Sequence, residues 1–147
     1  MKKGLIVIVA IVAVIAIIGG SLVSTYNGLV DKQADVENKE AQIQVQLQRR
    51  ADLIPNLVNT VKAYAEHEEG VYTALADARA KLNSASNPEE YNEANESFES
   101  ALSRLLVVVE NYPELKADKN FIALQDELAG TENRLSTARK DYNDIAT

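Results

Sequence analysis

The run Leu5 to Ile18 (LIVIVAIVAVIAII) constrains this chain more than any other feature, because it contains no polar side chain. With its neutral neighbours it extends over residues 4–23, long enough for a helix to cross a hydrocarbon core of roughly 30 Å. No comparably apolar partner exists elsewhere in the chain to bury it inside a soluble fold. The pattern predicts a membrane anchor at residues 1–24, in contact with the lipid bilayer through residues 4–23, and a separate domain at residues 25–147.

The charges around the run favour an uncleaved, single-pass anchor in a bacterial inner membrane. Lys2 and Lys3 precede the run and no charge follows it until Asp31, so the positive-inside rule places the N-terminus in the cytoplasm and the domain outside. A cleaved signal peptide is the alternative, because the fully apolar part has only 14 residues and ends in Gly19-Gly20-Ser21, without an A-x-A pattern. A lipoprotein is excluded, because no cysteine is present to carry the lipid.

The domain beyond the anchor is acidic, with 13 basic and 22 acidic side chains after Lys3 and a net charge of −9. Such a domain is a poor ligand for nucleic acid, whose binding depends on neutralised phosphates, and anionic lipid head groups repel it. With no cysteine, disulfides and thiolate chemistry are excluded. The composition therefore argues against nucleic-acid binding and fits an envelope protein or a cytosolic one.

Four long stretches beyond Ser24 carry apolar residues at helical spacing, and no segment alternates with the period of a strand. They are Tyr26 to Arg50, Leu57 to Leu82, Tyr91 to Tyr112 and Phe121 to Ile145. Asn87, Pro88 and Glu90 form a helix-start sequence, and Pro113 marks a further turn. The sequence predicts an all-α fold, in which the transmembrane helix precedes an antiparallel up-down bundle of about four long helices. Separate extended coiled coils are the alternative, and the turn-forming segments favour folding back.

The first of these helices has a thin apolar stripe. Gln33 and Glu40 stand at positions where the spacing of Leu29 and Val36 calls for apolar residues. A helix of this kind packs weakly in a bundle, so we expect its partner to be another copy of the chain or another protein. No proline separates it from the anchor, and we expect one continuous helix.

The segment Leu47 to Gly70 (LQRRADLIPNLVNTVKAYAEHEEG) concentrates charged residues, a proline and a histidine, and we interpret it as a corner between two helices. Asp52 is expected to cap the second helix, with Pro55 in its first turn. Arg49 and Arg50 then fall in the last turn of the first helix, where positive charge suits the carbonyl end. An anion or lipid head-group site at the corner is the functional alternative.

His67 is the single histidine and is flanked by Glu66, Glu68 and Glu69. Adjacent helical residues point about 100° apart, so these carboxylates do not converge on the ring. Zinc catalysis needs three converging ligands and helical di-iron sites need Glu-x-x-His, and neither pattern is present. We expect a solvated or capping histidine and assign no catalytic, cofactor-binding or metal-binding residue. A hydrolase or metal enzyme that uses His67 with nearby glutamates is the alternative.

The third helix carries an acidic stripe along one face. The stripe consists of Glu89, Glu93 and Glu96, with Glu90 and Glu99 beside it. No basic residue lies between Lys81 and Arg104 to balance it. Such a run is usually a solvated helix face, and a cation- or partner-binding face is the alternative.

Two long strings resemble the LemA family of bacterial membrane proteins. They are LQRRADLIPNLVNTVKAYAEHE (Leu47 to Glu68) and NYPELKADKNFIALQDELAGTENRLSTARKDYN (Asn111 to Asn143), supported by Tyr26-Asn27-Gly28-Leu29-Val30 and Ala78-Arg79-Ala80. The resemblance implies a membrane helix followed by a helical bundle, no established catalytic residues, and relatives that form or shape membrane compartments. It also implies an external amino terminus, opposite to the orientation that Lys2 and Lys3 favour. It implies a further helix and tail after Asn143 as well, whereas this sequence stops at Thr147, either because the chain is a short member or because a segment is missing.

Taken with the anchor, the helical pattern predicts a non-enzymatic, membrane-anchored scaffold or interaction protein of the bacterial envelope. We expect it to act through a protein partner or self-association, with no cofactor. A membrane-shaping or envelope stress-signalling component is the alternative role.

Overall fold

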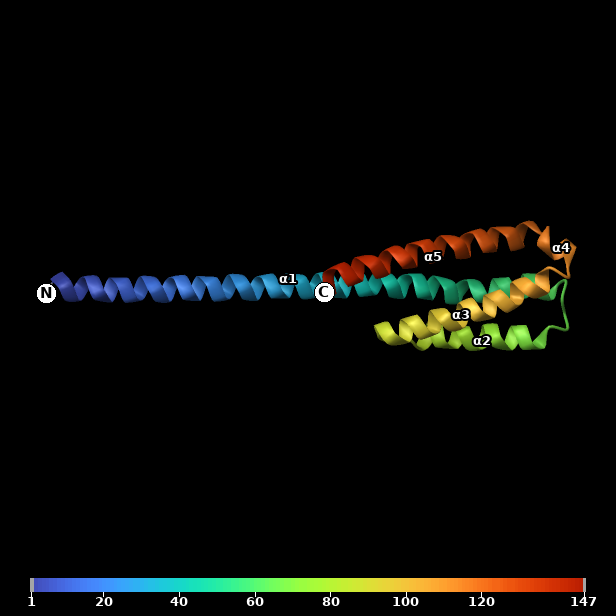
Figure 1. The fold of residues 1–147 in the computed structure, drawn as a ribbon, viewed down its shortest axis with the longest axis horizontal. Helices are drawn as coiled ribbons and strands as arrows, with labels where there is room; N and C mark the ends of the chain where they lie inside the picture. Colours follow the sequence, from blue (N-terminus) through green and yellow to red (C-terminus); the bar gives the residue numbers. More distant parts are fainter. Residues whose placement is uncertain (1, 147) are drawn as a thin grey trace. The chain divides into compact units, whose positions relative to one another are not determined.

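The computed structural model describes residues 2–146, with side chains from residue 4 onward. Its helices are α1 (Lys2–Lys62), α2 (Glu69–Ser84), α3 (Pro88–Val109), α4 (Pro113–Lys116) and α5 (Lys119–Ala146), as Figure 1 shows. No strand occurs within the described residues, so the all-α prediction is confirmed. The side chains of Lys2 and Lys3, on which the predicted orientation depends, and Thr147 lie outside the described part.

The chain divides into two compact units, Met1–Asn38 and Lys39–Thr147. In the first unit α1 is uninterrupted through its glycines, and its side chains from Gly4 to Asp35 are exposed. The apolar ones leave 47–70% of their surface uncovered. This part of α1 is long and apolar enough to cross a membrane, with a mean hydropathy of 3.1. The first unit therefore contains the N-terminal candidate membrane helix that the sequence predicts.

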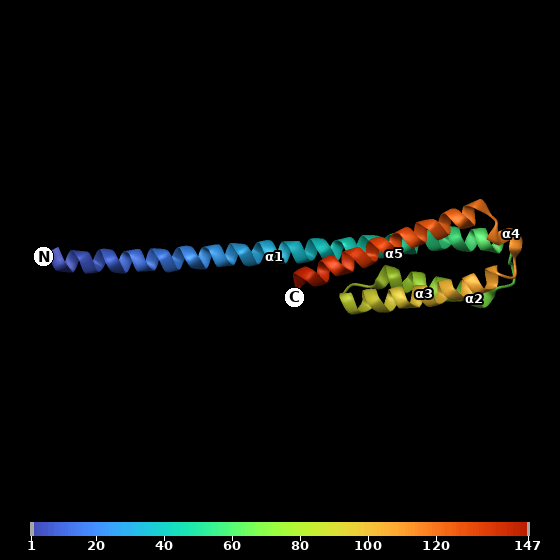
Figure 2. The same cartoon turned by 45° about the horizontal axis from the view of Figure 1, so that its top comes forward.

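The second unit contains four long helices that run alternately up and down. They are the C-terminal part of α1, then α2, α3 and α5. Each of the last three runs opposite to the long helix before it, and α4 is a single turn before α5 (Figures 1 and 2). Hydrogen bonds fix the neighbours of α1: Lys39 Nζ donates to Asp141 of α5 at 2.9 Å, and Tyr91 of α3 donates to Glu40 at 3.1 Å. The predicted antiparallel bundle is confirmed for this unit.

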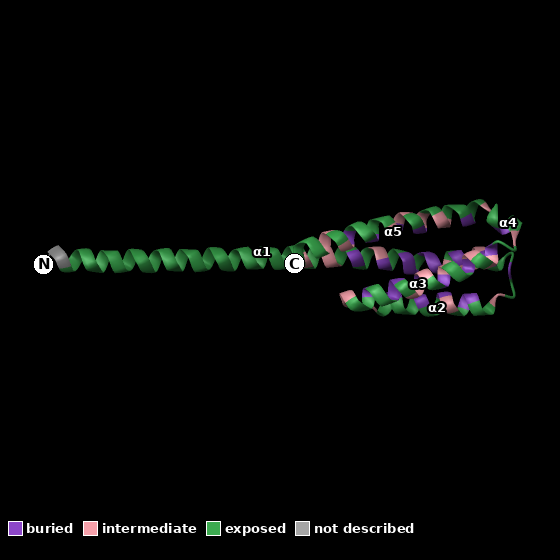
Figure 3. Cartoon of the chain, viewed as in Figure 1, coloured by how far each residue is buried: buried purple, intermediate pink, exposed green. Residues whose placement is uncertain are grey.

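The core of the second unit is built from the inward faces of all its helices (Figure 3). Its buried side chains on α1 are Ile43, Leu47, Ala51, Leu53, Ile54, Leu57 and Val61, and on the other helices they include Tyr72, Leu75, Tyr91, Phe98, Leu105, Leu115, Phe121, Leu128 and Leu135. Most stand at the helical spacing expected from the sequence. Burial of each large apolar side chain contributes about 1.5–3 kcal/mol, and this drives the helices together.

Two helix starts follow local sequence rules. Asn87 is extended, its Oδ1 accepts from Glu90 N at 3.0 Å, and Pro88 occupies the first turn of α3, as predicted. Asp118 begins α5 in the same way, because its Oδ1 accepts from Asn120 N at 2.8 Å and from Phe121 N at 3.0 Å. Each side chain pairs amides that the helix itself cannot satisfy.

The predicted corner at Asp52 is wrong. α1 continues through Asp52 and Pro55 to Lys62, and the chain turns at residues 63–68 instead. Asp52 is exposed and caps no helix, since its Oδ1 accepts from Gln48 Nε2 one turn earlier, at 2.9 Å. A proline inside a helix costs about 3 kcal/mol. Buried Leu53, Ile54 and Leu57 around it offset that cost by packing, so tertiary contacts override the local signal.

Hydrogen bonds between helix ends secure the true corner. Tyr72 on α2 donates its hydroxyl to the carbonyl of Ala65, which is buried in the connection. Tyr64 donates to Asp118 at 2.7 Å, and this bond is the first of the contacts that hold the pKa of the Asp118 carboxyl below its usual value. The bonds tie the end of α1 to the starts of α2 and α5.

Candidate functional site

Arg50 lies in the core of the second unit, and its side chain is only 1% exposed. The sequence placed it in the last helical turn, but it stands in the middle of the buried face of α1, between Leu47 and Ile54. Neighbouring Arg49 points about 100° away and is 54% exposed, with its Nη2 3.0 Å from Glu127 of α5. The adjacent arginines therefore have different environments.

The guanidinium of Arg50 contacts both α3 and α5. Nη1 donates to Asn95 Oδ1 at 2.5 Å and to Glu99 Oε1 at 2.6 Å on α3. On α5, Nε donates to Thr131 Oγ1 at 3.2 Å and Nη2 donates to Glu132 Oε2. Its Cζ also stands 5.1 Å from the ring centroid of Phe98. We call these residues, Arg50, Asn95, Phe98, Glu99, Thr131 and Glu132, the Arg50 cluster.

The Arg50 cluster surrounds the buried positive charge of the guanidinium with hydrogen-bond acceptors. A buried cation without partners is strongly unfavourable, and here two carboxylates and two neutral oxygens surround it. Glu99 and Glu132 remain 45% and 44% exposed, so each keeps contact with solvent while it pairs. The planar fork of arginine suits this geometry, in which three nitrogens reach two helices at once. The cluster fixes the register of α1 against α3 and α5.

A second arginine, Arg139 of α5, lies near the Arg50 cluster. Arg139 is partly buried, and its Nε and Nη2 have no hydrogen-bond partner among the described residues. Burial lowers the pKa of its guanidinium; Glu132 opposes this shift, the charge of Arg50 adds to it, and Glu96 again opposes it. Partly exposed carboxylates thus act on both arginines. Glu99 and Glu132 pair with Arg50, and Glu132 and Glu96 act electrostatically on Arg139.

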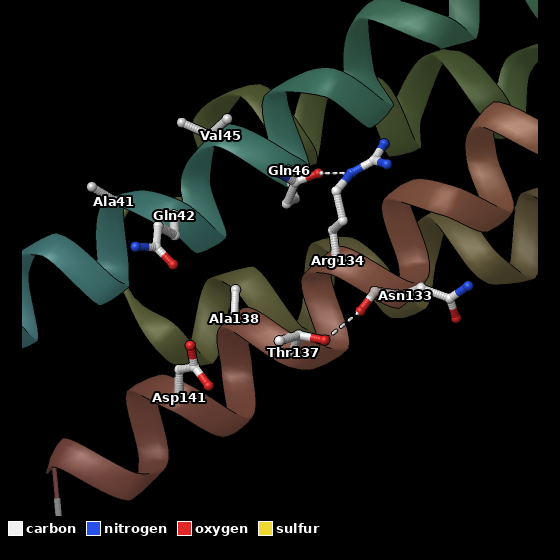
Figure 4. A pocket seen from close by; sticks show the side chains of 9 residues that line it. All are labelled: Ala41, Gln42, Val45, Gln46, Asn133, Arg134, Thr137, Ala138 and Asp141. Atoms are coloured by element: carbon white, nitrogen blue, oxygen red, sulfur yellow. Dashed lines mark hydrogen bonds between the residues drawn. The ribbon is translucent and has the colours of Figure 1, made fainter.

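The surface between α1 and α5 carries two shallow grooves. One, of about 520 Å³, is lined by Ala41, Gln42, Val45, Gln46, Asn133, Arg134, Thr137, Ala138 and Asp141 (Figure 4). Arg134 Nε donates to Gln46 Oε1 at 3.1 Å across it, and Thr137 bonds to its own helix. The other, of about 490 Å³, lies near Leu53 and Leu124. These linings are chiefly amide, hydroxyl and apolar groups, which suit contact more than acid–base chemistry.

His67 lies exposed in the connection between α1 and α2. The neighbouring glutamates do not gather around it: Glu68 instead accepts from Tyr112 at 3.3 Å. Within the described residues, no three His, Cys, Asp or Glu side chains form a group that could hold a metal ion.

Replacing His67 with alanine should leave the free energy of unfolding unchanged within about 0.5 kcal/mol, because an exposed side chain without partners contributes little. The check is urea unfolding of the full chain in detergent, followed by circular dichroism. Any cellular phenotype of the protein should also persist in the variant. A stable variant that loses the phenotype would revive the enzyme alternative.

The acidic stripe does not act as one surface. Glu93 pairs with Lys81 at 3.2 Å, and Glu90 accepts from the Ser86 backbone and hydroxyl at 2.8 and 3.0 Å. These bonds hold the pKa of Glu90 below its usual value. Glu99 belongs to the Arg50 cluster, and within the described residues Glu89 and Glu96 remain exposed without an ion pair or a hydrogen bond. Solvation and local pairing account for the stripe.

Sequence reasoning missed the Arg50 cluster, although a signal for it exists. Arg50 continues the 4-3 spacing of Ile43, Leu47, Ile54 and Leu57, and therefore stands at a core position. Thr131 likewise stands at the helical spacing of Leu128 and Leu135, and it is fully buried. Nothing in the sequence near Asn95 distinguishes it from other polar residues of α3.

The comparisons with known proteins agree with this architecture. The LemA family matches residues 39–147, the same residues as the second compact unit. The chain is 25% identical to Magnetosome protein MamQ 2 of Paramagnetospirillum magneticum, over 95% of this chain and 61% of the relative. It is 23% identical to Magnetosome protein MamQ of Magnetospirillum gryphiswaldense, over 97% and 63%.

A third relative is Protein LemA of Metamycoplasma hominis, 26% identical over 82% of this chain and 56% of the relative. The chain thus spans about three fifths of the length of the curated relatives it matches. The relatives and the apolar helix together indicate a membrane-associated helical protein. With the family pattern extending over residues 39–147, the chain belongs to the LemA family.

Proposed function

We propose that the protein is a non-enzymatic, membrane-anchored scaffold of the bacterial envelope that acts by protein–protein contact. The observation that carries this proposal is the composition of α1. One helix contains both the exposed apolar segment at residues 4–23 and the residues from Ile43 to Val61 that form the centre of the bundle core. α1 therefore belongs to both the membrane anchor and the folded domain.

Energetics support anchoring by this segment. Its Leu, Ile and Val side chains are 54–70% exposed, and nothing within the first unit covers them. Each such residue near a bilayer centre favours insertion by about 0.3–0.6 kcal/mol. The eleven large apolar residues between Leu5 and Ile18 therefore favour the membrane by roughly 5 kcal/mol in total.

The placement of charge supports a non-enzymatic role. The most concentrated ionic group of the second unit, the Arg50 cluster, points into the packed core, where it joins three helices. The grooves between α1 and α5 present mainly amides, hydroxyls and apolar groups, and their charged side chains, Arg49, Glu127, Arg134 and Asp141, are each engaged in an ion pair or a hydrogen bond. A domain built in this way offers stable surfaces for protein contact.

Deletion of residues 4–23 should move the protein from carbonate-washed membranes to the soluble fraction, while its helical circular dichroism is retained, since all core residues follow Lys39. Replacement of the same residues by leucines is the matched control and should restore membrane retention. A deletion variant that stays in washed membranes would contradict anchoring by this segment.

The contact role has a separate test. Lysine-reactive cross-linking of the full chain in cell membranes should give adducts larger than the monomer. Recovery of monomer alone would contradict the scaffold proposal. A reporter fused after α5 then decides the side of the membrane, and we propose the outer side on the basis of Lys2 and Lys3.

A further inference from the structure

The uncharged part of α1 is longer than a hydrocarbon core requires. No charged residue lies between Lys3 and Asp31, and at 1.5 Å per residue these two positions are about 42 Å apart along the helix. Residues 4–23 suffice for the hydrocarbon core of roughly 30 Å, whereas a bilayer with its head-group layers measures about 40–45 Å. The uncharged length therefore matches the whole bilayer, and residues 24–30 correspond to the head-group layer on the side of Asp31.

Residues 22–31 divide into an apolar and a polar face, unlike the uniformly apolar run before them. At about 100° per residue, the large apolar and aromatic side chains fall within an arc of about 100° around the helix. This arc, which we call the Tyr26 face, consists of Leu22, Tyr26, Leu29 and Val30, with Val23 at its border. The opposite arc, which we call the Asn27 face, consists of Ser24, Asn27, Gly28 and Asp31. A helix divided in this way suits a boundary between lipid and water.

The Tyr26 face is uncovered within the first unit. Tyr26 is 68% exposed, Leu29 61% and Val30 47%, and Figure 3 shows this region as exposed. Leu22, one turn before Tyr26, is 66% exposed and belongs to the candidate membrane span. The lipid that covers Leu22 in the span therefore also reaches the first residues of the face beyond it.

We infer that the Tyr26 face lies against the head groups and outer acyl chains of the leaflet that α1 crosses last, and that Asp31 is the first residue in water. The inference rests on the proposed function, whose membrane contact it extends from Val23 to Val30. It requires a tilted helix, because only a tilted helix keeps one face on the membrane after its axis has left the hydrocarbon core. Transmembrane helices are tilted by about 20° on average.

The side chains of the Tyr26 face suit this layer. Tyr26 stands about 4.5 Å beyond Val23 along the helix, at the level where tyrosine places its ring on the acyl chains and its hydroxyl among the head groups. Leu29 and Val30 lie on the same side of the helix, three and four residues further on. They keep the face apolar up to the first charged residue.

The charges beyond Val30 indicate which lipid surface the face fits. Asp31 and Asp35 stand on the side of the Asn27 face, directed away from the bilayer, and the Tyr26 face stays uncharged until Glu37. Lys32 is the single basic residue between Lys3 and Lys39. Because anionic head groups repel such an acidic segment, the face fits zwitterionic head groups.

Cysteine accessibility tests this placement, because the chain contains no cysteine. Leu29→Cys and Val30→Cys report on the Tyr26 face. Asn27→Cys and Gly28→Cys are the matched controls on the opposite face, each two residues nearer the hydrocarbon core. Every full-length variant is reconstituted with excess phosphatidylcholine into vesicles, and a charged maleimide is loaded on both sides by freezing and thawing. The labelling rate in vesicles is then divided by the rate in denaturing detergent.

The inferred tilt reverses the order that depth alone would give. Leu29→Cys should be labelled several-fold more slowly than Asn27→Cys, and Val30→Cys more slowly than Gly28→Cys, although both lie farther from the hydrocarbon core than their controls. A helix that leaves the membrane upright would instead show rates that rise steadily from residue 27 to residue 30. That order, or equal rates within the two pairs, would overturn the inference.

A quenching measurement identifies what covers the face. A fluorophore attached to Leu29→Cys should be quenched by lipids that carry a nitroxide on the head group, and more strongly than the same fluorophore on Asn27→Cys. Protection of Leu29→Cys that disappears when the proportion of lipid to protein is raised would show that a second copy covers the face. That result would overturn the assignment to lipid.

A charge on the face should detach it from the membrane. In the Val30→Cys chain, Leu29→Asp should raise the labelling rate several-fold, because an aspartate is unfavourable in contact with lipid. Asn27→Asp is the matched control on the opposite face and should leave the rate nearly unchanged. An equal response to the two substitutions would contradict contact through the Tyr26 face.

Leu22→Cys separates this inference from the proposed anchor. Slow labelling of Leu22→Cys, with rates that rise steadily from residue 27 to residue 30, would reject the tilted face and leave the anchor intact. Labelling of Leu22→Cys as fast as in denaturing detergent would reject both. Slow labelling of Leu22→Cys together with the reversed order in the two pairs supports both.

Discussion

Arg50→Ala should lower the free energy of unfolding by about 3 kcal/mol, toward the lower end of the range for breaking a buried ion pair. The variant leaves buried Asn95 without its partner and opens space beside Phe98. Glu99 and Glu132 moderate the loss, because both are nearly half exposed and can be rehydrated. Urea unfolding of the full chain in detergent, followed by circular dichroism, measures the change.

Arg49→Ala is the matched control for this prediction. It removes the same side chain from the neighbouring position, where Arg49 is 54% exposed and pairs with Glu127 on the surface. Exposed pairs contribute about 0–1 kcal/mol, so the control should unfold almost as the parent does. Equal losses in the two variants would show that Arg50 is not held in the core.

A double variant distinguishes the cause of the loss. Arg50→Met fills part of the space with an apolar chain but leaves Asn95 buried and unpaired, at a cost of about 1–3 kcal/mol. Arg50→Met combined with Asn95→Leu removes both polar groups and should regain most of the stability, as replaced buried networks often do. No recovery would indicate that the shape of the arginine, rather than the unpaired amide, limits stability.

Sequence periodicity was sufficient to predict the helical fold and most of the core. Apolar residues such as Leu57, Leu75, Phe98 and Leu128 repeat at helical spacing, and all four are buried. The start of α3 was also predictable from the sequence. Asn87 accepts a hydrogen bond from the backbone of Glu90 and Pro88 occupies the first turn, so no residue distant in sequence is needed. Local rules succeed where the competing interactions are also local.

The corner and the Arg50 cluster were not predicted, and both errors have one cause. Asp52 and Pro55 are strong local signals for a helix start, and placing a start there made Arg50 a helix-end residue. In the structure, the packing of α1 against the other helices keeps the helix intact through Pro55. The partners of Arg50 are 45–82 residues away in sequence, and no local pattern reveals them.

Pro55→Ala should stabilise the protein by about 1–2 kcal/mol. A proline inside a helix is about 3 kcal/mol less favourable than alanine, because it has no amide for the carbonyl one turn earlier and crowds it. That carbonyl belongs to Ala51, which is fully buried. Part of the gain is lost, because alanine leaves the unfolded chain more flexible by about 0.4–1 kcal/mol.

The chain supplies its own controls for this prediction. Pro88 and Pro113 occupy the first turn of α3 and of α4, where the missing amide would have no helical partner. Pro88→Ala and Pro113→Ala should therefore be neutral or destabilise by up to about 1 kcal/mol. If Pro55→Ala unfolds at the same urea concentration as these controls, Pro55 also stands at a helix start. A higher midpoint for Pro55→Ala alone identifies it as an interior residue of a continuous α1, held in place by the core around it.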